Sequence, residues 1–194
     1  MTSILEVEQL DTLSSNASST LTIGGDNTTT IAFGPNVTTT PSSLAMTPAF
    51  HAFLSSTQSL SDDTTTKVQC NSELYDTDNC YDNSTNYRFT PTVAGKYFVY
   101  GSWLSDNSTA STIQYGNARI RKNGSDILFQ ASDFRNNYAG YSNTFAVSGV
   151  VDFNGTTDYV ELYATIKIAS GTTGIGGNAT QSRTAFGGYK IIGA

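Results

Sequence analysis

The chain has 194 residues, of which 38% are hydrophobic and 11% aromatic, so it can bury one sizeable core. Only 13% of the residues are charged, and 16 acidic against 10 basic side chains leave a net charge of −6. This balance argues against nucleic-acid binding, which needs clustered Lys and Arg, and no apolar stretch reaches the length of a membrane span.

The first segment, residues 1–47, is rich in Thr, Ser and Asn and ends in a proline-containing stretch. Its apolar residues are too sparse to offset an ordering entropy of about 1 to 2 kcal/mol per residue. We therefore expect a β-rich extension that is either flexible or ordered by other chains. The aliphatic residues that we expect to dock on a particle are Ile4, Leu5, Val7, Leu10, Leu13, Leu21 and Ile23. No basic region precedes an apolar core here, so we expect no secretory signal.

Residues 89–101 concentrate aromatic side chains behind a proline-containing turn. Alternation in and just after this stretch predicts a strand with two apolar faces. One face carries Tyr97, Val99 and Trp103, and the other carries Phe98, Tyr100 and Leu104. Such a strand needs two apolar partners. The first is the opposite sheet, and we expect the second to be a neighbouring subunit.

A hairpin is predicted in residues 118–129, where Asn123 and Gly124 can adopt the positive φ angles of a primed turn. The tightest basic cluster of the chain lies in its first strand, at Arg119, Arg121 and Lys122. Its alternating spacing is typical of a strand that leads into a turn and is too small for a nucleic-acid footprint.

Residues 145–153 and 160–168 both alternate apolar and other side chains with a period of two. Asn154 and Gly155 lie between them and predict a tight connection, so we expect the two strands to form a second hairpin. Many short strands with regular turn signals and no helical repeat indicate an all-β sandwich or barrel.

Two further segments have more than one interpretation. The glycine-rich residues 171–177 resemble a phosphate loop only superficially, because no Lys follows, and we expect a flexible apical loop. Cys70 and Cys80 could close a small loop or remain free thiols, and free thiols are the expectation for a protein made in the cytosol.

The candidates for metal binding and catalysis are few. A cluster of acidic residues could offer oxygen ligands to Ca²⁺ but lacks the spacing of a calcium loop, so we expect solvated carboxylates and no cofactor. These residues are Asp62, Asp63, Asp76, Asp78 and Asp82. His51 is the only histidine, and no Ser or Cys nucleophile motif accompanies it. We expect a packed or subunit-contact histidine and no enzymatic activity.

Five motifs in order, over about residues 48–194, resemble the globular head of complement C1q and its tumour-necrosis-factor-like relatives. They are PAFHAF as a first strand, YRFTPTVAGKYFVYG as the central signature, RIRKNG as a basic strand, VSGVVDFNGTTDYVELYA as a strand pair, and FGGYKI as the closing strand. The resemblance implies a jelly-roll sandwich. Because the relatives are compact trimers, it also implies a homotrimer, with a monomeric sandwich as the alternative. The residues implied for core or trimer contact are Phe50, Phe53, Phe89, Gly95, Tyr97, Val99, Trp103, Phe186, Gly188 and Tyr189.

A jelly-roll head behind a Thr/Asn-rich segment resembles structural proteins of bacteriophages. This resemblance implies a virion surface protein, either a capsid decoration trimer or a short fibre, that stabilises the particle or attaches to a host. We expect the loops around residues 76–86, 106–115, 136–143 and 171–178 to face outward. The alternative is a secreted or surface glycan-binding module, and the tyrosines that could face a ligand are Tyr115, Tyr138 and Tyr141.

Overall fold

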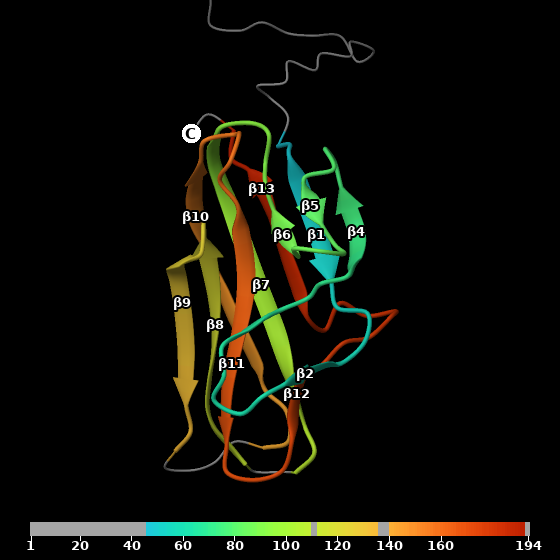
Figure 1. The fold of residues 1–194 in the computed structure, drawn as a ribbon, viewed down its shortest axis with the longest axis vertical. Coiled ribbons are helices and arrows are strands. Elements are labelled where there is room, and N and C mark those ends of the chain that lie inside the picture. Colours follow the sequence, from blue (N-terminus) through green and yellow to red (C-terminus); the bar gives the residue numbers. More distant parts are fainter. Residues whose placement is uncertain (1–45, 110–111, 136–139, 193–194) are drawn as a thin grey trace, which may run out of the picture. The chain divides into compact units, whose positions relative to one another are not determined.

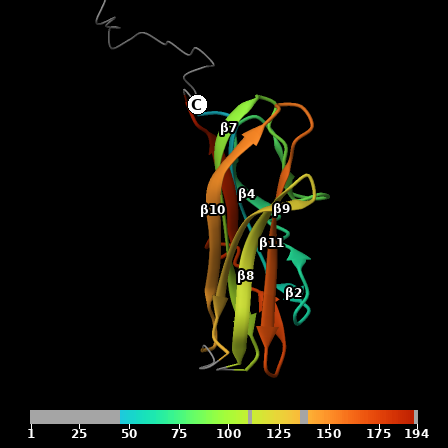
Figure 2. The same ribbon diagram turned by 90° about the vertical axis from the view of Figure 1, so that its left-hand side faces the viewer.

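The computed structural model describes residues 46–109, 112–135 and 140–192, and all regular structure within them is β-strand. The strands form two sheets that pack face to face (Figures 1 and 2). In these residues there is no helix of the length and apolarity that a membrane span requires. The predicted fold class, an all-β jelly-roll sandwich, is confirmed.

The larger sheet has seven strands, and its longest member, β7, lies in the middle. From one edge to the other, the main part of the sheet contains β10 (Thr144–Phe153), β7 (Gly95–Asn107), β13 (Ala185–Lys190), β1 (Ala49–Phe53) and β4 (Ser72–Asp76). The C-terminal end of β7 pairs instead with β12 (Thr173–Ile175), which in turn pairs with β2 (Gln58–Leu60). All of these pairs are antiparallel.

The smaller sheet has six strands and covers the inner face of the larger one. Its order is β5 (Tyr81–Asp82), β6 (Arg88–Phe89), β11 (Val160–Ile168), β8 (Ile113–Lys122) and β9 (Ser125–Asp133), and β3 (Thr66–Lys67) also pairs with β11. Each sheet therefore contributes one apolar face to a shared core, as in other β-sandwiches.

As the sequence predicts, successive side chains of β7 point alternately to the two faces of the sheet. Tyr97, Val99 and Trp103 point inward and are completely buried, whereas the alternate residues of the same strand are half-exposed. Full burial of one such side chain stabilises the fold by about 1.5 to 3 kcal/mol. The Trp103 ring stacks on Phe145 at 4.7 Å, and its indole N–H donates a 3.0 Å hydrogen bond to the carbonyl of Asn117.

The predicted hairpin at Asn123 and Gly124 is confirmed. These residues have φ angles of 51° and 85° and join β8 to β9, which are paired along their length. The first of these angles favours Asn and the second favours Gly, so the local sequence is sufficient to specify this turn.

The predicted hairpin between residues 145–153 and 160–168 is wrong, although both strands exist. β10 pairs with β7 in the larger sheet and β11 pairs with β8 in the smaller one, so their connection crosses between the sheets. The connection itself is a tight turn, because the Asn154 side chain accepts hydrogen bonds from the backbone N–H groups of Thr156 and Thr157 at 2.9 and 3.0 Å. A local turn signal cannot distinguish a hairpin from a crossover.

The expectation of a flexible apical loop at residues 171–177 is also wrong in part. Thr173, Gly174 and Ile175 form β12, which has a hydrogen-bonded neighbour on each side. The partner strand β7 is 13 residues long and extends beyond β13, so its free edge is available to this short segment.

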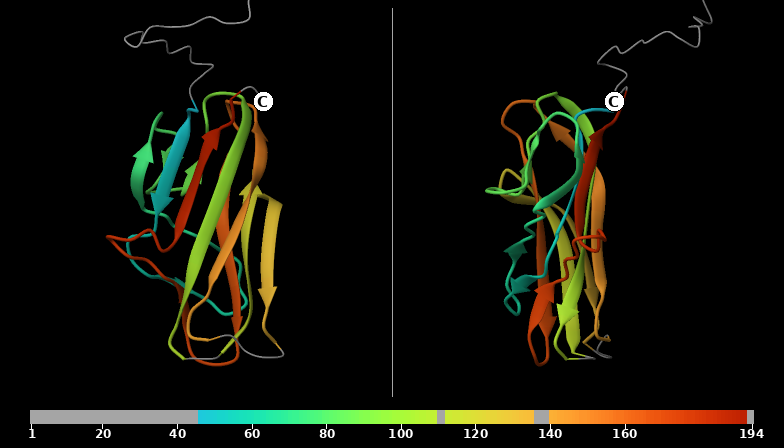
Figure 3. Two further views of the ribbon diagram at one scale, coloured as in Figure 1. Left: turned by 180° about the vertical axis from the view of Figure 1, so that it is seen from behind. Right: turned by 90° about the vertical axis from the view of Figure 1, so that its right-hand side faces the viewer.

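The described chain begins and ends at the same end of the sandwich, where Pro48 precedes β1 and Ile192 follows β13 (Figures 1 and 3). The C-terminal ends of β7 and β11 and the N-terminal end of β10 lie at the opposite end, which we call the distal end. The loop of residues 76–86 lies beside β4 and β5 and not at the distal end, so the expected outward loops do not form one group.

Candidate functional site

The outward surface of the larger sheet is aromatic, and we call it the aromatic face. The register places one row of side chains across five strands: Tyr75, His51, Gly187, Tyr100 and Ser148. The adjacent row contains Ala49, Tyr189, Phe98 and Val150. Neither row contains Asp, Glu, Lys or Arg, which is unusual for a sheet surface in contact with water.

The side chains of the aromatic face contact one another. The hydroxyl of Tyr100 lies 2.7 Å from Nδ1 of His51, and the rings of Phe98 and Tyr189 are 5.7 Å apart. Gly187 leaves room for the Tyr100 ring, because a Cβ at this position would lie 2.3 Å from the Tyr100 hydroxyl oxygen. The first glycine of the closing strand therefore supports the aromatic face directly.

A hollow of about 430 Å³ lies on the outward side of β7 and β10. Phe98, Tyr100, Ala146 and Ser148 line it, and Gln130 reaches it from β9. Val150 is 55% exposed on β10, and Phe129 is 52% exposed on β9. One subunit therefore carries both a hollow of mixed polar and apolar lining and exposed apolar side chains at the β9–β10 edge, and exposed apolar side chains are typical of protein interaction sites.

His51 carries the only imidazole in the two rows. Partial burial lowers the pKa of its imidazole, which favours the neutral form. Its second ring nitrogen lies 3.4 Å from the Ser182 hydroxyl, at the limit of a hydrogen bond. The environment is that of a packed surface histidine, because the groups that approach it are hydroxyls and aromatic rings.

The outward surface of the smaller sheet differs in that its side chains form ion pairs, and we call it the ion-paired face. Glu161 of β11 is 3% exposed and lies 2.6 Å from Lys67 and 3.5 Å from Arg88. Arg119 and Arg121 both contact Asp126, at 2.8 and 2.5 Å. The guanidinium groups of Arg88 and Arg121 also lie over the rings of Tyr159 and Tyr163, at 4.2 and 4.3 Å.

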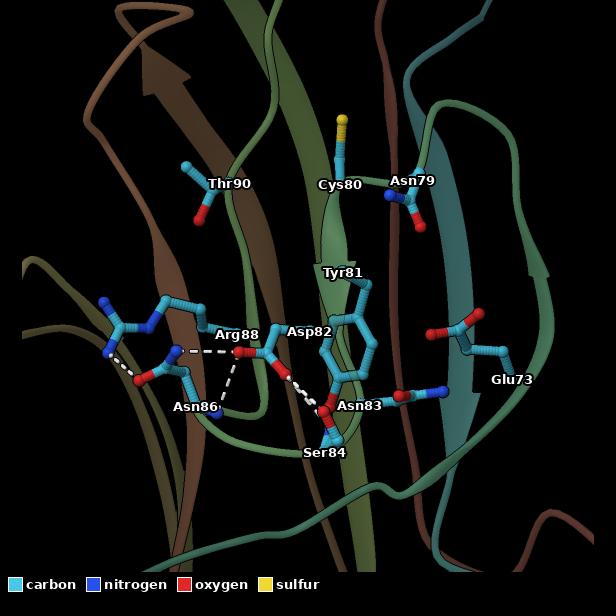
Figure 4. A pocket seen from close by; sticks show the side chains of 10 residues that line it. All are labelled: Glu73, Asn79, Cys80, Tyr81, Asp82, Asn83, Ser84, Asn86, Arg88 and Thr90. Atoms are coloured by element: carbon cyan, nitrogen blue, oxygen red, sulfur yellow. Dashed lines mark hydrogen bonds between the residues drawn. The ribbon is translucent and has the colours of Figure 1, made fainter.

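A polar cleft of about 610 Å³ lies beside β5 and β6, in the 76–86 region (Figure 4). Asp82 is its best-connected group, since one carboxylate accepts hydrogen bonds from the backbone N–H groups of Ser84, Thr85 and Asn86. These bonds, that of Thr85 foremost, hold the pKa of Asp82 well below its usual range. Asp82 therefore stabilises its own loop, and it also accepts a 3.2 Å hydrogen bond from the Ser84 hydroxyl.

The acidic residues of the sequence analysis do not converge. Asp62 binds Lys167 and the N–H of Ile168, Asp63 accepts a hydrogen bond from Tyr115, and Asp78 accepts one from Thr77. Within residues 46–109, 112–135 and 140–192, no three His, Cys, Asp or Glu side chains lie close enough to hold a metal ion.

Both cysteines are buried and unbridged. Burial raises the pKa of the Cys70 thiol to about 12 and also raises that of Cys80. Thiols with raised pKa values are poor nucleophiles at neutral pH, so this pair packs in the core without reactive chemistry.

The residues implied for core or trimer contact separate into two groups. Seven of them lie within the sandwich: Phe50, Phe89, Tyr97, Val99, Trp103, Phe186 and Gly188. Phe53 and Tyr189 are half-buried on the outward side, and Gly95 begins β7 with a φ of 140°. The expected docking residues of the first segment lie outside the described residues.

The three expected ligand-facing tyrosines have different positions. Tyr141 is 55% exposed at the distal end, whereas Tyr115 is half-buried in β8 with its hydroxyl bound to Asp63. Tyr138 lies outside the described residues. Of the two that the structure describes, Tyr141 is the one with an exposed ring.

The fold and the strand order are those of a TNF/C1q-like jelly roll. The crystal structure of murine APRIL at pH 8.0, a TNF-family jelly-roll protein, has a TM-score of 0.51 with this chain at 12% sequence identity. The match covers 74% of this chain and 98% of the APRIL chain. No protein-family model matches the sequence, and no curated protein matches it.

Proposed function

We propose that this protein is a non-enzymatic, homotrimeric surface protein of a virion, whose jelly-roll head is displayed by an N-terminal docking segment. The aromatic face carries the proposal, because a row from Tyr75 to Ser148 without one charged side chain needs an apolar partner. A second copy of the chain is the partner that we infer.

The two apolar surfaces of one subunit differ, and this difference favours a ring. The aromatic face and its hollow lie on the outward side of β7, whereas Phe129 and Ile127 lie on the β9 edge. A contact between unlike surfaces closes into a ring when the rotation permits, and TNF-like folds commonly form trimers. Three copies would cover each aromatic face with the edge of a neighbour.

Two features support the assignment to a virion. They are the composition of the N-terminal segment and the end of the sandwich at which the chain enters the head. Residues 1–47 are rich in Thr, Ser and Asn with interspersed aliphatic residues, which suits a segment that becomes ordered only on a larger particle. The chain enters the sandwich at the end opposite the distal loops. Docking through residues 1–40 would leave the distal end facing solvent, for particle stabilisation or attachment to a host.

The test compares the full chain with a variant that lacks residues 1–40. Both proteins should be trimers by light scattering at micromolar concentration, and only the full chain should join particles. A monomeric full chain would refute the trimer, and full incorporation of the truncated chain would refute the docking role. If the truncated head binds glycans on an array while the full chain joins no particle, the alternative of a glycan-binding module is correct.

A further inference from the structure

A polar groove of about 270 Å³ lies at the distal end, where β2, β12 and β7 run side by side. The register places Gly174 of β12 between Ser59 of β2 and Asp106 of β7. Gly174 has no side chain, and a Cβ there would lie 3.1 Å from the Thr57 methyl group, so Thr57 packs over this position. The residues that line the groove are Thr57, Ser59, Asp106, Asn107, Ser108, Tyr141, Thr172, Thr173 and Gly174.

The wall of the groove that carries Tyr141 is held in place by a buried amide. Asn107 is 1% exposed, donates a 3.1 Å hydrogen bond to the carbonyl of Tyr141 and accepts one of 2.6 Å from the Thr173 hydroxyl. Ser105 accepts a further bond from the N–H of Asn143 at 2.8 Å. The backbone at Tyr141 is therefore anchored to β7 while its ring stays 55% exposed, which is an arrangement prepared for contact with a ligand.

Several polar groups of the groove have hydrogen-bonding capacity to spare. One oxygen of Asp106 accepts a bond from the Thr57 hydroxyl at 3.2 Å, and the other makes none with the described residues. Within the same residues, the hydroxyls of Ser59 and Thr172 also make no hydrogen bond, and Asp106 forms no ion pair. No Lys or Arg lines the groove, so its only formal charge is the carboxylate of Asp106.

These groups match the chemistry of a sugar. A pyranose ring has an apolar C–H face that stacks on an aromatic ring and a rim of hydroxyls that bind carboxylate and hydroxyl groups. The negative charge of Asp106 favours an uncharged sugar over one that carries a carboxylate. The groove is smaller than the 300 to 1,000 Å³ that is usual for drug-sized ligands, so it suits about one sugar residue.

We propose that this distal groove binds one uncharged sugar residue of a surface glycan, with Tyr141 as the stacking platform and Asp106 as the acceptor for ring hydroxyls. The proposal names the ligand class for the attachment role and in that sense rests on the proposed function. A single small subsite binds weakly, and three copies in one trimer give the avidity that attachment needs.

The test uses the full chain and free monosaccharides, with binding followed by saturation-transfer NMR and by titration. Glucose, galactose, mannose and N-acetylglucosamine represent uncharged sugars, and glucuronate and N-acetylneuraminate represent acidic ones. We expect at least one uncharged sugar to bind with a Kd of about millimolar and the acidic sugars to bind at least about tenfold more weakly.

Variants of two groove residues separate stacking from hydrogen bonding. Tyr141→Ala should weaken binding about tenfold, whereas Tyr141→Phe keeps the ring and should stay within about twofold of the native protein. Asp106→Asn should reduce the discrimination against acidic sugars. Asp152→Asn, on β10 away from the groove, is the matched control and should bind sugar as the native protein does.

Absence of saturable binding by every uncharged sugar would overturn the proposal, and so would unchanged binding by Tyr141→Ala. Light scattering on the same samples keeps this result apart from the trimer proposal. A trimer that binds no sugar refutes only the groove, whereas a monomer that binds sugar refutes only the trimer.

Discussion

The two outward faces of the sandwich differ in their chemistry, although both belong to antiparallel sheets of one small domain. On the ion-paired face, Glu161, Asp126 and their cationic neighbours pair within the subunit. On the aromatic face, Phe98, Tyr100 and Val150 have no charged neighbour in their rows, and Val150 is more than half exposed.

A sheet surface can therefore either pair its charged side chains within one subunit or leave apolar side chains exposed for a partner. The ion-paired face satisfies its charges within the subunit. The aromatic face leaves apolar area in contact with water, at a cost of about 25 cal/mol for each Å² that a partner could cover. The predictions below test this contrast in order of decreasing expected effect.

A charge on the aromatic face should abolish assembly. Phe98→Asp places a carboxylate beside Tyr189 and Val150, where a partner subunit would have to desolvate it. We expect the mass by light scattering to fall about threefold, while the folding stability of one subunit changes by about 1 kcal/mol or less, because Phe98 is half-exposed there. Gln69→Asp, at an exposed position just after β3, is the control and should leave the trimer intact. A Phe98→Asp trimer at micromolar concentration would show that the aromatic face is not the contact.

Loss of the buried carboxylate should destabilise the fold without changing assembly. Glu161→Gln removes the partner of Lys67 and Arg88, and because both cations keep about a quarter of their exposure, we expect a loss of about 2 to 3 kcal/mol. Urea denaturation measures this loss, and light scattering should report an unchanged mass. The control, Asp152→Asn, breaks the exposed pair with Lys96 and should cost about 0.5 kcal/mol or less. Equal losses in the two variants would show that burial does not distinguish these ion pairs.

Acidification should slightly lower the folding stability through protonation of His51 on the aromatic face. Its pKa is lowered by burial from 6.5, so the unfolded chain binds the proton more strongly than the folded one. The free energy of unfolding is therefore not reduced by His51 protonation above pH 6.5, and it declines as the pH falls from 6.5 to the lower pKa of the folded state. Thermal unfolding of the native protein and of His51→Asn, compared across this window, should show a decline that is smaller in the variant. Parallel curves for the two proteins would exclude His51 as the cause.

Much of the local structure could be predicted from the sequence. Alternation predicted the strands at residues 145–153 and 160–168 and the two faces of β7, and Asn123 with Gly124 specified the β8–β9 turn. These features depend on residues within a few positions of one another, where side-chain direction and φ preference act directly.

The pairing of strands and the burial of particular polar groups could not be predicted in this way. The turn at Asn154 gave no indication that β10 and β11 belong to different sheets, and the glycine-rich stretch gave none that it contains β12. Glu161 alternates with apolar residues and has the pattern of a solvent-facing side chain, yet Lys67 and Arg88 cover it from other strands. The distal groove likewise combines Ser59, Asp106 and Tyr141 from segments far apart in the chain.

The sequence by itself determined that this protein is built of β-strands and which side chains of each strand share a face, because both properties follow from a repeat of two residues along a local backbone. Only the tertiary structure decided which strands are neighbours, which outward face remains aromatic and which polar groups meet in the distal groove. Those outcomes depend on contacts between residues far apart in the chain, such as the bond of Thr65 to Thr165 and the pairing of Ala49 with Tyr189, and no local repeat encodes them.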